Sequence, residues 1–130
     1  MSLPMRLIAF CIGMLVFVSP VVAIDVDTYL MLGVDKSEAG DYRGALIEFN
    51  KAIDIDPNNA TAFQYRGVAK ARYGDFEGSI LDYSKSIMLN SNNVESYSSR
   101  GIAKARIGNI AGAILDFDVA IELNLSLIHI

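Results

Sequence analysis

Groups that could perform chemistry are few in this chain of 130 residues, which has one histidine, His129, and one cysteine, Cys11. Serines are frequent, but a serine hydroxyl needs a neighbouring base to become a nucleophile, and no such motif is present. Asp116 and Asp118 point to different faces of a helix and do not form a catalytic pair of acids. The sequence also lacks a nucleophile elbow, a phosphate-binding loop and a metal-binding pair of histidines. We therefore predict that the protein is not an enzyme and uses no cofactor, metal ion or small-molecule substrate.

The balance of charge excludes some classes of partner. The chain carries 11 Lys and Arg residues against 15 Asp and Glu residues, for a net charge of −4. Phosphate groups are bound by concentrated positive charge, and the sequence contains no cluster of basic residues. We therefore expect neither nucleic acid nor an anionic membrane surface as a partner.

A repeat of 34 residues organises most of the chain. Each unit has apolar residues at helical spacing and a Gly-Asp or Gly-Asn turn near its middle, which indicates two helices per unit. In the turn, glycine can adopt a positive φ and the next side chain can cap the following helix. The positions in register are Gly33, Gly67 and Gly101; Lys36, Lys70 and Lys104; Gly40, Gly74 and Gly108; Gly44, Gly78 and Gly112; Ala45, Ser79 and Ala113; Phe49, Tyr83 and Phe117; and Ala52, Ser86 and Ala120. The pattern predicts an all-α protein of tandem antiparallel helix hairpins.

The glycine of each unit's first helix predicts where the two helices touch. Glycine inside a helix costs about 1 kcal/mol relative to alanine. That cost is tolerable if the missing side chain lets the paired helix approach closely. We expect Phe49, Tyr83 and Phe117 to fill the space opposite these glycines.

Charged residues in the repeats have two possible roles. Arg66 and Arg100 each precede an aspartate on the second helix of the unit, and we predict Arg66–Asp82 and Arg100–Asp116 ion pairs. Contact of these arginines with a ligand is the alternative. The lysine series is predicted to form a solvated face whose aliphatic stems cover apolar surface; it consists of Lys36, Lys70 and Lys104.

The first 23 residues resemble an export signal. Arg6 precedes an apolar run from Leu7 to Val18, and small residues occupy Val21 to Ala23. We expect cleavage after Ala23 and a periplasmic or secreted product. The alternative is an uncleaved anchor in the inner membrane, formed by Leu7–Ile24, which would be the only contact with a membrane.

The last six residues, 125–130, depart from the repeat and read Leu-Ser-Leu-Ile-His-Ile. The transposon mosaic-end sequence used to prepare sequencing libraries encodes the same six residues. We hypothesise that they are an adapter scar on a truncated reading frame, and we expect further repeats or another domain to have been lost. The alternative is an apolar tail that covers the final hairpin.

The repeated motif resembles the tetratricopeptide repeat (TPR) family over Val26 to about Asn124. The first unit carries the family's pattern at Tyr29, Leu32-Gly33, Gly40-Asp41-Tyr42, Ala45, Phe49, Ala52 and Pro57. The second unit departs from it at Ser79, Ser86 and Ser91. The resemblance implies a right-handed solenoid of about three repeats, at residues 26–59, 60–93 and 94–124, with a concave groove lined by the first helix of each repeat.

What the resemblance implies about function is a groove that binds a protein or peptide segment. Carried onto this sequence, the family's groove positions are Leu30, Val34, Glu38, Gln64, Val68, Arg72, Ser98, Ile102 and Arg106. We expect a ligand with an apolar stripe and some acidic character. The family's clamp for the C-terminal carboxylate of chaperones is missing, because its positions hold Leu30, Val34, Tyr65, Glu95 and Ser99.

The sequence thus predicts an exported adaptor or scaffold. The alternative is an N-terminal repeat module of a longer exported or membrane-tethered enzyme or assembly protein.

Overall fold

A computed structural model describes residues 24–128 of the chain. The predicted signal segment, Cys11 and His129 lie outside the described residues. All the regular secondary structure within residues 24–128 is α-helical. The helices are α2 (Val26–Glu38), α3 (Tyr42–Ile55), α4 (Ala60–Tyr73), α5 (Phe76–Leu89), α6 (Val94–Arg106) and α7 (Ile110–Ile128).

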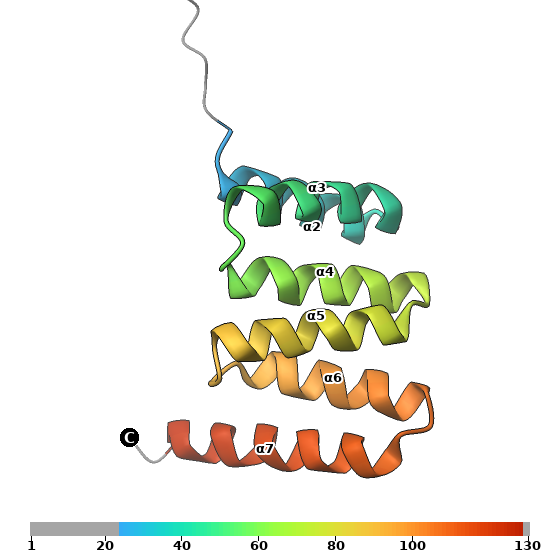
Figure 1. Cartoon of the computed structure of the whole chain (residues 1–130), viewed down its shortest axis with the longest axis vertical. Coiled ribbons are helices and arrows are strands. Elements are labelled where there is room, and N and C mark those ends of the chain that lie inside the picture. Colours follow the sequence, from blue (N-terminus) through green and yellow to red (C-terminus); the bar gives the residue numbers. More distant parts are fainter. Residues whose placement is uncertain (1–23, 129–130) are drawn as a thin grey trace, which may run out of the picture.

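The helices form a stack of antiparallel hairpins, α2–α3, α4–α5 and α6–α7 (Figure 1). Each helix packs on the next one in the chain, and α4 also touches α2 and α6. Contacts are therefore limited to a hairpin and its neighbours, as in a solenoid. The predicted all-α fold of about three tandem helix hairpins is confirmed.

The turn within each hairpin has the predicted construction. In the middle hairpin Gly74 ends α4 with a φ of 98°, a left-handed conformation that costs glycine little. The Asp75 carboxylate then accepts a 2.9 Å hydrogen bond from the backbone N–H of Gly78 and caps α5. Asp41 and Asn109 make the equivalent caps in the other two hairpins.

The glycine in the first helix of each hairpin lies against the aromatic ring of the second helix. A Cβ atom placed on Gly67 would be 2.8 Å from Cε1 of Tyr83, whose side chain is buried with 2 % of its surface exposed. Gly33 and Gly101 face Phe49 and Phe117 in the same way. The predicted close approach of the two helices is confirmed.

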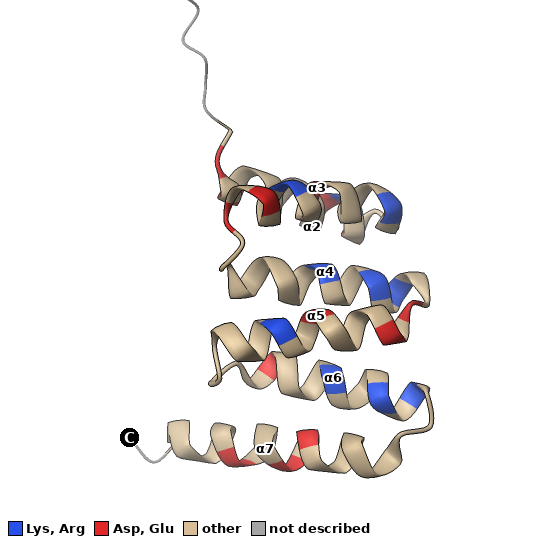
Figure 2. Cartoon of the chain, in the orientation of Figure 1, with Lys and Arg blue, Asp and Glu red and all other residues tan. Residues whose placement is uncertain are grey.

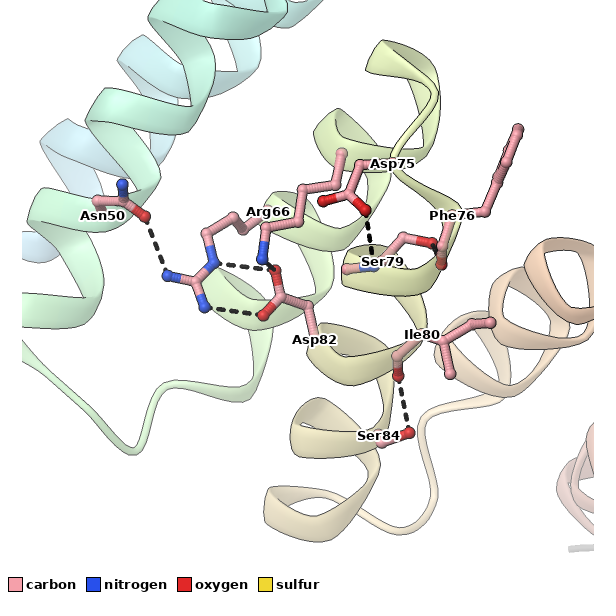
Figure 3. A network of polar contacts seen from close by, with 10 residues as sticks. Asn50, Arg66, Asp75, Phe76, Ser79, Ile80, Asp82 and Ser84 are labelled. Atoms are coloured by element: carbon pink, nitrogen blue, oxygen red, sulfur yellow. Dashed lines mark hydrogen bonds and ion pairs between the residues drawn. The ribbon is translucent and has the colours of Figure 1, made fainter. Parts of the chain in front are cut away.

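Ion pairs join the two helices of the second and third hairpins. Nε and Nη2 of Arg66 donate to the two carboxylate oxygens of Asp82, at 2.9 and 2.8 Å (Figure 3). Nη1 of Arg66 donates to Asn50 on α3, so one guanidinium links two hairpins. Arg100 makes the same bidentate pair with Asp116, and both predicted pairs are confirmed.

The prediction of a solvated lysine face is wrong. Lys70 Nζ lies 2.9 Å from Asp82 and Lys104 Nζ lies 3.0 Å from Asp116, so each aspartate serves two cations. In the first hairpin Lys36 donates to a different acid, Glu48, at 2.7 Å. The lysines turn toward the acids of the second helix because these carboxylates are buried and need compensating charge.

These contacts shift the pKa of two carboxyl groups. The hydrogen bond from Lys36 lowers the pKa of Glu48, against the opposing effect of burial. Burial alone would raise the pKa of Asp116, but the hydrogen bonds from Arg100 and Lys104 outweigh it and the pKa falls below its ordinary value. Both groups are therefore held in their charged form.

The end of the described chain is helical. Helix α7 runs past Asn124 to Ile128, and Leu125, Leu127 and Ile128 are exposed. The last two residues of this segment lie outside the described part of the chain, and both the adapter scar and the covering tail stay predictions. Across residues 24–128, no helix is both long and apolar enough to cross a lipid bilayer.

Candidate functional site

Three adjoining hollows lie along the side of the stack lined mainly by α2, α4 and α6. Their volumes are about 390, 390 and 310 Å³. The first and second hollows share Val34 and Tyr65, and the second and third share Val68 and Arg72. The hollows therefore form one continuous groove, which we call the groove below.

Six of the nine residues predicted for the groove line it with partly or fully exposed side chains. Both walls contribute apolar side chains, and Ile102 keeps 54 % of its surface exposed. Glu38, Arg72 and Arg106 are exposed charged residues in the last turns of their helices. The six residues are Val34, Glu38, Val68, Arg72, Ile102 and Arg106.

Of the other three predicted residues, two line the groove with buried side chains and one lies outside it. Leu30 touches the first hollow but is buried in the core. Gln64 lines the second hollow but is also buried, and its amide donates to Glu95 at 2.8 Å and accepts from Asn93 at 2.7 Å across the boundary between hairpins. Ser98 lines a separate hollow against α7.

Several residues that line the groove were not among the predicted positions. Tyr65 lines two hollows, and its ring centroid lies 6.0 Å from that of Phe49. Ser99 and Tyr83 line the third hollow. The sequence could have indicated Tyr65 and Ser99, because they occupy positions of the family's carboxylate clamp. Since the clamp residues themselves are missing, these two positions were not assigned to the groove.

The charge along the groove changes sign. The first hollow is lined by Asp27 and Asp35 and by no basic residue. The second combines Glu38 and Glu95 with Arg72, and the third has Arg72 and Arg106 without an acid. Figure 2 shows Lys and Arg in the last turns of α4 and α6.

The third hollow also contains hydroxyl groups. Burial raises the pKa of the Tyr83 phenol to about 12, and the neighbouring Ser99 side chain opposes that shift. The phenol therefore stays protonated at physiological pH. Within residues 24–128, no group of three or more His, Cys, Asp or Glu side chains is arranged to hold a metal ion.

Comparisons with known proteins support the fold. No protein-family model matches the chain. A 38-residue stretch is 53% identical to the tetratricopeptide repeat protein 36 homolog of Nematostella vectensis, which is 29% of this chain and 21% of that protein. The match thus spans about a fifth of that relative's length.

Solved structures share the arrangement of helices. The crystal structure of MamA has a TM-score of 0.79 at 22% identity, covering 82% of this chain and 62% of that one. The first TPR of Spaghetti (RPAP3), bound to the HSP90 peptide SRMEEVD, has a TM-score of 0.75 at 25% identity over 76% of this chain and 79% of that one. The Sgt2 TPR domain from Aspergillus fumigatus has a TM-score of 0.74 at 20% identity over 76% and 66% of the two chains.

The class of protein that the fold defines is an α-helical repeat solenoid. Its helices pack as adjacent pairs like those of the TPR domains among the structural neighbours, and a 38-residue stretch is similar to a tetratricopeptide repeat protein.

Proposed function

We propose that this chain is an exported TPR scaffold that binds a segment of a protein or peptide along the groove. The observation that carries the proposal is the continuity of the three hollows, which share residues from one to the next. An elongated trough with apolar walls and charged edges suits an extended segment better than a compact small molecule. The structural neighbour that holds the peptide SRMEEVD supports the same use of this fold.

The ligand we propose differs from that peptide. The peptide SRMEEVD is rich in carboxylates, which bind to cationic side chains. This groove instead holds Glu95 and apolar Val34 at positions matching the family's clamp. Arg72 and Arg106 are the cations that this groove offers instead. The partner is therefore not assigned to the C-terminal tail of a chaperone.

The groove is tested by selecting peptides from a phage-displayed random library against the purified chain. Ile102→Glu places a charge on the apolar wall, and we expect it to weaken a selected peptide at least about tenfold, equivalent to about 1.4 kcal/mol. Leu81→Glu is the matched control, because Leu81 is 71 % exposed on α5 and does not line the groove. If the two substitutions change the Kd equally, as measured by fluorescence polarisation, the peptide binds to another surface.

Export is proposed from Arg6, the apolar run and the small residues before Ile24. N-terminal sequencing of the mature product should begin at Ile24 if the signal is cleaved after Ala23. A product that retains Met1 in the membrane fraction would instead support the anchored form.

A second candidate is a repeat module that belongs to a longer exported or membrane-tethered enzyme or assembly protein. The exposed apolar side chains of α7 favour it, because Ile114 and Ile121 are more than half exposed, whereas Ile80 and Ile87 at the same positions of the middle hairpin are partly buried. The reading frame determined from uncut genomic DNA distinguishes this candidate from the first.

A further inference from the structure

Arg72 and Arg106 make the third hollow suited to an anion. They occupy equivalent positions of consecutive hairpins and border the same hollow. Within residues 24–128 neither forms an ion pair, whereas Arg66 and Arg100 are each held by an aspartate. A guanidinium binds a carboxylate through two parallel hydrogen bonds, so these two arginines can receive one carboxylate between them.

The surroundings of this hollow favour a carboxylate attached to an apolar neighbour. Ser99 contributes a hydroxyl group to the lining. Val68 and Ile102 supply apolar wall. Water is displaced from the apolar wall when a ligand enters, which strengthens the attraction between the carboxylate and the arginines.

The first hollow has the opposite preference. Asp27 and Asp35 line it, and neither is paired with a cation among the described residues. The Tyr65 ring forms part of the same wall, and its contact with Phe49 holds it in place. Two carboxylates beside an aromatic ring attract lysine or arginine, through ion pairing and through the negative face of the ring.

The distance between the two hollows sets the spacing of the charges on the ligand. Packed helices are about 8–10 Å apart, and an extended peptide advances about 3.3 Å per residue. Moving from the boundary of α2 and α4 to that of α4 and α6 therefore takes about three residues. Between these ends, the second hollow presents Val34 and Val68 to the residues in the middle, and Glu38 and Glu95 also line it.

We infer that the groove selects an extended peptide segment with a fixed order of charge. A lysine or arginine lies beside Asp35, an apolar side chain follows in the middle, and an aspartate or glutamate side chain lies between Arg72 and Arg106. The inference rests on the proposed function and adds the chemical class of its ligand. In a peptide that keeps the same chain direction in the groove, reversing the order of charge places like charges together at both ends.

The first test is the sequence of the peptides selected from the random library. We expect a basic and an acidic residue two to four positions apart, always in the same order, with an apolar residue between them. Synthesis of one such peptide with an amidated C-terminus restricts the test to side-chain carboxylates. Exchanging its acidic residue for lysine should weaken binding at least about tenfold.

The second test exchanges charges on the protein. Arg72→Glu combined with Arg106→Glu should bind the lysine-exchanged peptide more tightly than the original one, which reverses the preference of the unchanged chain. Arg43→Glu, an exposed arginine of α3 that does not line the groove, should leave the preference as it was.

The outcomes separate this inference from the proposed function. Peptides that are weakened by Ile102→Glu but show no order of charge would overturn the inference and leave groove binding intact. Loss of binding on amidation would assign the carboxylate to a peptide terminus and would also overturn it. If Ile102→Glu leaves the affinity of the selected peptides unchanged, the proposed function itself is overturned.

Discussion

Replacing Asp82 by alanine removes the acceptor that Arg66 and Lys70 share at the interface of α4 and α5. The carboxylate receives three short contacts, at 2.9 and 2.8 Å from Arg66 and 2.9 Å from Lys70. Its side chain keeps 5 % of its surface exposed, whereas Arg66 keeps 20 % and Lys70 keeps 23 %. The substitution therefore leaves two cations with partial access to water and no carboxylate partner.

The expected loss lies between the values for buried and exposed ion pairs. Stranding a fully buried charge costs about 3–5 kcal/mol, and breaking an exposed pair costs about 0–1 kcal/mol. Arg66 and Lys70 can recover part of their hydration, and Arg66 keeps its hydrogen bond to Asn50. We therefore expect Asp82→Ala to lower the free energy of unfolding by about 2–3 kcal/mol. Arg66→Ala and Lys70→Ala should each cost less, because the carboxylate keeps one cation.

Urea unfolding followed by far-ultraviolet circular dichroism measures this free energy without screening charges. Asp118→Ala is the matched control, since Asp118 is exposed on α7, and we expect a change of about 0.5 kcal/mol or less. If Asp82→Ala costs within about 1 kcal/mol of the control, the shared carboxylate does not stabilise the hairpin as reasoned here.

Two further predictions concern packing and pH. Gly67→Ala should lower stability by about 1–2 kcal/mol, because the clash with the buried Tyr83 ring exceeds the gain in helix propensity of about 1 kcal/mol. Gly101→Ala should be nearly neutral, since its facing ring is only half-buried and can move; thermal unfolding compares the two, and a higher midpoint for Gly67→Ala would contradict the argument. Glu48 and Asp116 have lowered pKa values in the folded chain, so their stabilisation is complete above the ordinary values of 4.5 and 3.8 and is lost as pH falls below them. Urea titrations at several pH values should show this acid loss, and Asp116→Asn should reduce it.

Prediction from the sequence worked best for contacts within one hairpin. Arg66 and Asp82 are 16 residues apart and face each other because each lies at a repeated position of its helix. The partner of Lys70 was missed because a lysine at the surface of a helix is usually solvated. Only the packed structure shows that the same buried carboxylate needs a second cation.

The groove was predicted in part, for a geometrical reason. With 3.6 residues per turn, residues spaced by four drift about 40° around a helix at each step. Leu30, Val34 and Glu38 therefore span about 80°, and only part of that arc faces the groove. Leu30 falls at the end of the arc that packs into the core, as Gln64 does at the boundary with α6.

The sequence by itself determined that the chain builds helix hairpins of one size, because turns, glycines and aromatic residues recur at a constant interval and act locally. Only the tertiary structure decided that three hollows join into one groove whose charge runs from acidic to basic. The walls of each hollow come from helices of different hairpins, so their charges meet only after the hairpins have packed.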